Sequence, residues 1–141
     1  MALSVHHDKS VLGVDWSKID TVLLDMDGTL LDLRFDTQFW TETVPATYAQ
    51  TQGIDLEAAQ AYLNPIHARE SGHLYWYCLD FWSKIVGFDI AQLKQQHAAN
   101  ISWRPEAENF LRRLRASHCE VVLITNAHPD TLRIKLQQIR L

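Results

Sequence analysis

The fold of this chain is organised around the sequence Val22-Leu23-Leu24-Asp25-Met26-Asp27-Gly28-Thr29. Its first three residues form a short apolar run, which stops at a carboxylate and a glycine-containing turn. An apolar run bounded by turn residues in this way is typical of a buried β-strand. We therefore expect a strand at residues 22–24 that delivers Asp25 and Asp27 at its carboxyl end.

A second apolar run has the same shape, and it reads Val121-Val122-Leu123-Ile124 before Thr125 and Asn126. Its β-branched residues favour a strand over a helix. The residues between the two strands look helical almost throughout, and Pro129 or Asp130 opens a further helix after the second strand. This order predicts an α/β fold in which a β-α-β unit carries an all-helical insertion.

Several residues predict where helices begin and end within the insertion. Asp55 and Asp89 are expected to cap helices, because an aspartate side chain accepts a hydrogen bond from a free N–H of the first turn. Gly87 is placed to end an aromatic-rich helix that spans residues 74–86. Pro45 and Pro65 should kink or break the helices that contain them, since proline has no N–H to donate.

Composition and charge limit the classes of protein that the chain fits. Its 141 residues are 47% hydrophobic, which is enough for one folded domain. A formal net charge of -4, a pI near 5.9 and no basic cluster beyond Arg112-Arg113-Leu114-Arg115 give no indication of binding to a nucleic acid polymer or a membrane. We find neither an apolar run of about 18 residues nor an apolar leader, so a cytoplasmic protein is expected. Cys78 and Cys119 match no metal-ligand spacing and are expected to be reduced thiols.

The residues with the clearest chemistry are Asp25 and Asp27. Two carboxylates at the end of a buried strand are costly unless a divalent cation or another positive charge compensates them. In an α/β sheet, ligands bind beyond the carboxyl ends of parallel strands, where Thr125 is also expected. Gly28 permits a turn in which backbone N–H groups are free to face a phosphate.

Two other interpretations of this motif are available. Asp-x-Asp-Gly is also common in turns that merely end a strand. A calcium-binding EF-hand loop needs glycine at its sixth position and glutamate at its twelfth, counted from Asp25. Leu30 and Asp36 occupy these positions, so the calcium loop is excluded.

The sequence Leu23-Leu24-Asp25-Met26-Asp27-Gly28-Thr29-Leu30-Leu31-Asp32 resembles the first motif of the haloacid dehalogenase superfamily. The segment 121–126 resembles the second motif of that superfamily, and the two motifs stand in the right order around a helical insert. The resemblance implies a Rossmann-like core of parallel strands, incomplete here, formed by residues 1–33 and 101–141. It also implies that residues 34–100 form an inserted helical cap.

The resemblance implies a role for each residue of the two motifs. Asp25 would be the nucleophile that forms an aspartyl-phosphate, and Asp27 would be the general acid and base. The Asp25 carboxylate and the backbone carbonyl of Asp27 would hold Mg²⁺, and Thr125, Asn126 and Gly28 would bind the phosphoryl group. A carboxylate at position 27 is typical of the phosphatase and phosphomutase members of the superfamily.

A finer resemblance concerns the substrate. Several short segments in and around the insert are similar to those of the GMP/IMP 5'-nucleotidase group. They are Leu31-Asp32-Leu33, Phe35-Asp36, Phe39-Trp40, Trp76-Tyr77-Cys78-Leu79-Asp80 and Trp82. The segment Thr125-Asn126-Ala127-His128-Pro129 is similar to the same group. This implies that the substrate is a purine mononucleotide; the alternative is another small phosphate ester, such as a sugar phosphate or phosphoglycolate.

Two groups of residues in these segments each allow two interpretations. The aromatic residues of segment 76–82 either pack in the helical core or stack on a nucleobase. His128 either approaches the phosphate or caps the last helix. His67 shows no metal-ligand spacing and is expected to lie at the surface or in packing.

The chain also departs from the superfamily pattern. That pattern needs a lysine and an acidic pair downstream of the second motif; Lys135 lies too early in the following helix to be that lysine. The sheet would keep two strands with open edges, which could pair with a second copy. The chain is expected to be either a shortened form of a longer phosphatase or a naturally short metal- or phosphate-binding module. We expect the chain alone to hydrolyse phosphate esters slowly or not at all.

Overall fold

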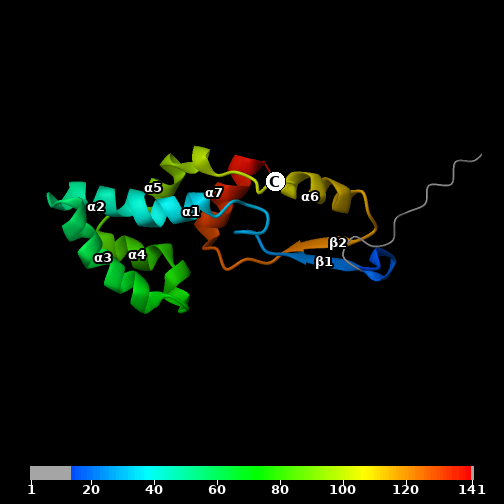
Figure 1. Ribbon diagram of the computed structural model, residues 1–141, viewed down its shortest axis with the longest axis horizontal. Helices are drawn as coiled ribbons and strands as arrows, with labels where there is room; N and C mark the ends of the chain where they lie inside the picture. Colours follow the sequence, from blue (N-terminus) through cyan, green and yellow to red (C-terminus); the bar gives the residue numbers. More distant parts are fainter. Residues whose placement is uncertain (1–13, 141) are drawn as a thin grey trace, which may run out of the picture.

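A computed structural model of the protein describes residues 14–140, and it is a mixed α/β structure (Figure 1). The expected order of strand, helical insert, helix, strand and helix is confirmed, although residues 1–13 of the predicted core segment lie outside the described part. The helical insert contains α1 (Arg34–Gln38), η2 (Phe39–Thr43), α2 (Val44–Gln52), α3 (Leu56–Glu70), η3 (Leu74–Tyr77), α4 (Leu79–Val86), α5 (Ile90–Gln96) and η4 (Ala98–Asn100). The remaining elements are η1 (Trp16–Lys18), β1 (Thr21–Leu24), α6 (Ala107–Arg115), β2 (Glu120–Leu123) and α7 (Pro129–Ile139).

The sheet consists of β1 and β2, which pair in parallel with Val22 opposite Val121 and Leu24 opposite Leu123. Because the strands are parallel, both carboxyl ends lie at the same edge of the sheet, where the chain enters the helical insert (Figure 1). The helix α6 covers one face of the sheet, and its Leu114 packs with Leu24 and Leu30 in a small core. The sheet therefore holds the two chemically important segments side by side.

The other face of this sheet is open in the described structure. Leu23, which points to this face, is 61% exposed, and Val121 is 40% exposed even though it shares the α6 face with Val22, so the expectation that both strands are buried is wrong. Successive side chains of a strand point to opposite faces, and only the face under α6 is covered by apolar residues. The sequence pattern identified the strands correctly, but it did not show that only one face is covered.

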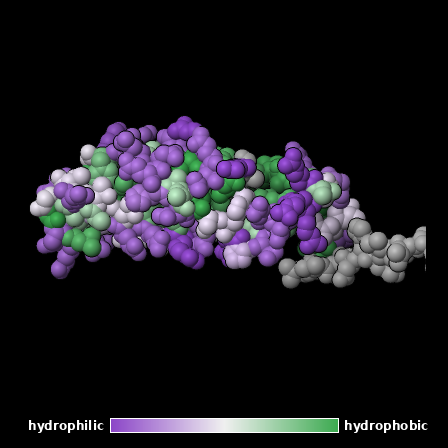
Figure 2. Space-filling view, turned by 90° about the horizontal axis from the view of Figure 1, so that it is seen from above, coloured by the Kyte–Doolittle hydropathy of each residue, from purple (hydrophilic) through white to green (hydrophobic). Residues whose placement is uncertain are grey.

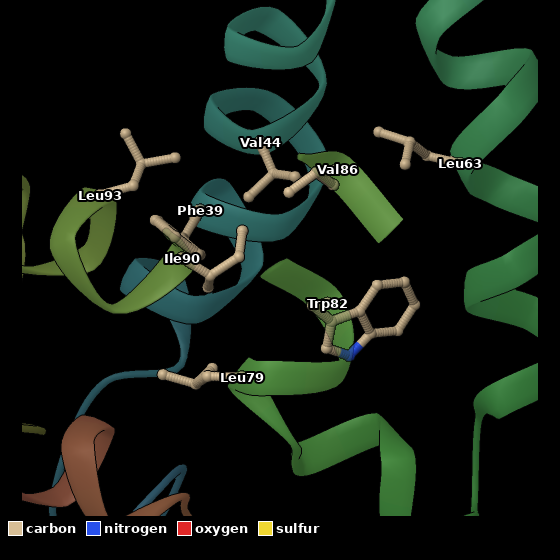
Figure 3. Close-up of a cluster of buried hydrophobic side chains, with 8 residues drawn as sticks. All are labelled: Phe39, Val44, Leu63, Leu79, Trp82, Val86, Ile90 and Leu93. Carbon is tan, nitrogen blue, oxygen red and sulfur yellow. The ribbon is translucent and has the colours of Figure 1, made fainter. Parts of the chain in front are cut away.

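The helical lobe, which we define as residues 34–100, has the larger core. Its buried side chains point toward one another from four helices and the π-helical turn η2 (Figure 3), and they are Phe39, Val44, Leu63, Leu79, Trp82, Val86, Ile90 and Leu93. Trp82 is 1% exposed, and its indole N–H donates to the carbonyl of Trp76 at 3.1 Å. This lobe buries a compact apolar interior, in contrast to the sheet.

The predicted helix boundaries are confirmed at three residues of this lobe. The side chain of Asp55 accepts a hydrogen bond from the N–H of Ala58 at 2.7 Å, and Asp89 accepts one from Gln92 at 3.0 Å. Gly87 ends α4 in the left-handed conformation, with φ of +79°. Local capping chemistry therefore placed these ends correctly before any tertiary contact was known.

The two prolines behave differently from each other. Pro45 lies in the first turn of α2, directly after the π-helical turn η2, so the expected interruption is present. Pro65 lies inside α3, which continues to Glu70, and the expected break is wrong. Pro65 is on the exposed side of its helix, where water can satisfy the carbonyl that lacks a donor.

The helix α7 lies at the junction between the sheet and the helical lobe (Figure 1). Its Ile134 packs in a shared core with Met26 and Leu31 from the loop after β1, Phe35 from the start of the helical lobe and Ile101 from just after the lobe. Most of the face shown in Figure 2 is polar, with hydrophobic side chains in separate patches. None of the helices in residues 14–140 has the length and apolar character needed to cross a bilayer.

Candidate active site

The loop after β1 folds back on itself through backbone hydrogen bonds. The N–H groups of Leu30 and Leu31 both donate to the carbonyl of Met26 at 2.9 Å, and Gly28 donates to Leu31 at 2.8 Å. Gly28 has φ of +80°, and a Cβ there would lie 3.0 Å from a methyl group of Leu33. The expectation that the Gly28 N–H is free for a phosphate is therefore wrong. Gly28 is required for the shape of the turn.

This loop is also held from the segment that precedes α6. Arg104 donates from its backbone N–H to the carbonyl of Leu30 at 2.8 Å, and its guanidinium donates to the carbonyl of Gly28 at 2.7 Å. Asp25 is exposed at the end of β1, where one of its carboxylate oxygens lies 3.4 Å from the hydroxyl of Thr29. The turn thus presents the Asp25 carboxylate to solvent from a fixed backbone.

The segment after β2 begins beside this loop. Ile124 donates to the carbonyl of Leu24 at 2.7 Å, which extends the parallel pairing to the point where Thr125 starts. The Thr125 hydroxyl accepts a hydrogen bond from the N–H of Ala127 at 3.1 Å. His128 caps α7, since its Nδ1 accepts from the N–H of Asp130 at 3.3 Å. Of the two interpretations of His128, helix capping is confirmed.

One cleft of about 530 Å³ brings the two motifs together. Asp25, Asp27, Thr125 and Asn126 line it, together with His128. This confirms the expectation that the polar residues at the ends of both strands converge. A volume of this size lies in the usual range for a small-molecule site.

The helical lobe forms the opposite wall of the cleft. Trp40, His67, Trp76 and Tyr77 line this wall, whereas Trp82 is fully buried in the core behind it. The aromatic residues of the insert are thus divided between the core and the wall of the cleft, and stacking on a nucleobase stays a prediction. His67 was expected to be a surface or packing residue, and it lies in a cluster of indole rings with centroid distances of 4.5–5.8 Å.

A cluster of two buried lysines and two partly buried aspartates lies at the base of the cleft. The ammonium of Lys135 lies 2.5 Å from Asp27 Oδ1 and 2.5 Å from Asp36 Oδ2. Lys94 lies 2.7 Å from the other oxygen of Asp36, and its ammonium is 4.6 Å from the centroid of the Phe39 ring. Both lysine side chains are 2% exposed, so neither ammonium is solvated by bulk water. Two carboxylates and two ammoniums compensate one another.

The pKa values of the two carboxylates in this cluster are shifted in opposite directions. Burial raises the pKa of Asp27, and the ammonium of Lys135 only partly opposes this effect. Burial alone would also raise the pKa of Asp36, but the ammoniums of Lys94 and Lys135 together outweigh it and lower the pKa. Burial lowers the pKa of Lys94. The difference arises because Asp36 contacts two ammoniums, whereas Asp27 contacts one.

The sequence did not predict three members of this cluster. The sequence pattern assigns no role to Asp36 or Lys94, and Lys135 follows Thr125 too closely to be the lysine of the superfamily. Lys135 nevertheless reaches Asp27 from the adjacent helix α7. Thr131, Ile134 and Lys135 form the buried side of α7, which faces this junction. Their spacing was the signal that could have placed Lys135 near the site.

The sequence predicted two oxygen donors as metal ligands, the carboxylate of Asp25 and the backbone carbonyl of Asp27, and their role stays a prediction. Within residues 14–140, no three His, Cys, Asp or Glu side chains are close enough to hold a metal ion. The Asp25 carboxylate is available, and the backbone carbonyl of Asp27 accepts none of the loop hydrogen bonds between described residues. Two oxygen donors of this kind fit Mg²⁺, which usually takes few protein ligands and completes its shell with water and phosphate oxygens.

Comparison with known proteins identifies relatives in sequence. Residues 19–141 match the family model described as haloacid dehalogenase-like hydrolase. The chain is 40% identical over 126 residues to the GMP/IMP nucleotidase YrfG of Escherichia coli (strain K12), and equally to that of Shigella flexneri. The match covers 89% of this chain and 57% of each relative, so the chain spans little more than half of their length.

Comparison with solved structures supports the fold. The crystal structure of a HAD phosphatase from Thermococcus onnurineus superposes with a TM-score of 0.70 at 22% sequence identity. The superposition covers 86% of this chain and 57% of that structure. At this identity, the likeness establishes the arrangement of the elements.

Proposed function

Because this chain belongs to the haloacid dehalogenase-like hydrolase family, we propose that its cleft is the site of a phosphatase that acts through an aspartyl-phosphate. The observation that carries the proposal is the convergence of Asp25, Asp27 and Thr125 on one cleft. Asp25 is exposed at the end of its strand, in a position from which a carboxylate oxygen can attack a phosphorus atom.

The proposed reaction has two steps. In the first step, a carboxylate oxygen of Asp25 forms a bond to phosphorus while the ester P–O bond breaks, and protonated Asp27 gives its proton to the departing alkoxide. In the second step, Asp27 takes a proton from water, the water oxygen attacks phosphorus, and the bond between Asp25 and phosphorus breaks to release phosphate. The raised pKa of Asp27 supports its role as the acid.

The groups that bind the phosphoryl oxygens follow from the same geometry. The Thr125 hydroxyl and the Asn126 backbone would donate to them, since both residues line the cleft beside Asp25. The Asp25 carboxylate and the Asp27 carbonyl would hold Mg²⁺, which neutralises phosphate charge when it is bound. Gly28 would act through the shape of the loop.

We propose a purine 5'-mononucleotide as the substrate and residues 34–100 as the cap over the phosphate site. The relatives with 40% identity are named GMP/IMP nucleotidases. The cap wall of the cleft also offers the flat side chains of Trp40 and Trp76, with His67 between them. Aromatic rings of this kind suit a planar base. The cytoplasmic location stays a prediction from the sequence.

The test uses residues 1–141 fused to the part of the Escherichia coli relative that follows the matched region, with phosphate release measured for a panel of phosphate esters. We expect hydrolysis of GMP and IMP that requires both Mg²⁺ and Asp25, with no activity in Asp25→Asn. Hydrolysis of sugar phosphates or phosphoglycolate in preference to nucleotides would overturn the substrate assignment. Activity that survives Asp25→Asn would overturn the mechanism. The chain alone is the comparison, and it is expected to give little or no turnover.

A further inference from the structure

We propose that Lys135 is a positioning residue for Asp27, and that its second carboxylate partner, Asp36, makes this positioning depend on the helical lobe. The inference rests on the proposed function, in which Asp27 gives a proton to the leaving group. It assigns a role to a residue that takes no part in the chemical steps described above. The contacts of four side chains carry the inference.

The first contact distinguishes the two oxygens of Asp27. Lys135 donates to Oδ1 at 2.5 Å, whereas Oδ2 accepts no hydrogen bond from the described residues. The terminal torsion of an aspartate is broad, so a carboxylate without an anchor samples many orientations. Proton transfer requires an oxygen within hydrogen-bond reach of the leaving group. Lys135 holds one oxygen and leaves the other available in the cleft that Asp27 lines.

Lys135 is itself held in place by burial. Its side chain is 2% exposed, and its two contacts with Asp27 and Asp36 are the ion pairs that it makes among residues 14–140. A buried ammonium that loses a carboxylate partner has no bulk water to compensate its charge, so losing the pair is energetically costly. Lys135 therefore stays against Asp27 as long as α7 keeps its position. A solvated surface lysine would not restrict Asp27 in this way.

The second partner extends this arrangement into the helical lobe. Asp36 belongs to α1, the first helix of the lobe, and Lys94 belongs to α5, the last α-helix of the lobe. The Lys94 ammonium lies 2.7 Å from Asp36 and also packs over the rings of Phe35 and Phe39. Asp36 is thus fixed from the lobe on one side and pairs with Lys135 on the other. A movement of the lobe relative to α7 displaces Lys135 or breaks its pair with Asp36.

A first experiment tests the contacts in the chain itself, without any catalysis. The chain is labelled with ¹³C at the aspartate carboxyl carbons, and the Asp27 signal is assigned by its loss in Asp27→Asn. We expect this signal to move in Lys135→Met and also in Lys94→Met, whose ammonium does not contact Asp27. Lys84→Met, which changes an exposed lysine of α4, is the matched control and leaves the signal unchanged. An Asp27 signal whose chemical shift is unchanged in Lys94→Met overturns the proposed dependence on the helical lobe.

A second experiment tests positioning through the leaving group, in the fusion described under the proposed function. An alkoxide such as the ribose 5'-oxygen needs a proton as it departs, whereas p-nitrophenolate departs without one. We expect Lys135→Met to lower kcat/KM for IMP about 100-fold, and for p-nitrophenyl phosphate less than about fivefold. Lys135→Arg, which keeps a cation, should recover part of the loss on IMP. Equal losses on both esters would reduce Lys135 to a structural residue and overturn the proposal.

The two experiments separate this proposal from the proposed function. A fusion that hydrolyses neither ester contradicts the phosphatase assignment, and the carboxyl signals of the chain then decide whether Lys135 and Lys94 set the state of Asp27. If Lys135→Met does not fold, both the carboxyl signals and the kinetics are measured on Lys135→Arg and Lys94→Met instead. In that case, a ratio of kcat/KM for IMP to kcat/KM for p-nitrophenyl phosphate that equals the ratio of the unsubstituted fusion in both variants overturns the proposal.

Discussion

The helical lobe and the sheet differ in how completely they bury their apolar side chains. The lobe encloses Phe39, Trp82 and Ile90 at 2% exposure or less, whereas the sheet leaves Leu23 61% exposed and Val121 40% exposed. Both regions supply residues to the same cleft. The comparison indicates that apolar burial stabilises the lobe more than the sheet, while the site at their junction also depends on buried charge pairs.

The largest expected effect is on the core of the lobe. Trp82→Ala removes a fully buried side chain and should lower the free energy of unfolding by about 3–5 kcal/mol. Urea unfolding of the chain followed by circular dichroism measures the change. The matched variant in the sheet is Leu23→Ala, which should cost less than about 0.5 kcal/mol because the side chain is mostly exposed. Comparable losses in the two variants would contradict the difference between the regions.

The next effect concerns the charge cluster at the junction. Lys94→Met removes one of the two ammoniums that face Asp36, and it should lower the free energy of unfolding by about 2–3 kcal/mol. A double-mutant cycle with Asp36→Asn isolates the pair, and we expect a coupling of more than about 1 kcal/mol. Additive effects in the cycle would show that the two side chains do not interact in solution.

A smaller effect is expected in the loop after β1. Gly28→Ala places a Cβ 3.0 Å from Leu33 at a residue with φ of +80°, so it should cost about 1–2 kcal/mol. Gly53→Ala is the control: it has φ of +66° but no heavy atom within 4 Å of the added Cβ, so only the conformational cost applies. Thermal unfolding of both variants measures the difference. An equal loss of stability in the two variants would show that the contact with Leu33 is not a reason for glycine at position 28.

The smallest expected effect is a dependence on pH that arises in the lobe. Burial lowers the pKa of His67 below its ordinary value of 6.5, so the unfolded chain binds the proton more readily than the folded one. Stability should therefore fall as the pH drops below about 6.5. His67→Phe keeps an aromatic ring and should reduce this dependence in unfolding measured between pH 7.5 and pH 5.5. An unchanged slope in the variant would exclude His67 as its origin.

Local chemistry allowed a large part of the fold to be predicted. The two strands to within one residue, the caps at Asp55 and Asp89 and the helix end at Gly87 depend on neighbouring residues, so the sequence alone placed them. The break expected at Pro65 was wrong, because the exposure of that side of α3 depends on how the helix packs. The openness of one sheet face could not be predicted for the same reason, since it depends on which helix covers the sheet.

The residues of the candidate site also differ in whether the sequence could predict them. The sequence by itself determined that Asp25, Asp27 and Thr125 end two parallel strands, because apolar runs and turn residues act over a few neighbours. Only the tertiary structure decided that Lys135 meets Asp27 and Asp36, 108 and 99 residues away along the chain. A buried ion pair between distant residues forms where helices pack and water is excluded, and no local pattern specifies such a place.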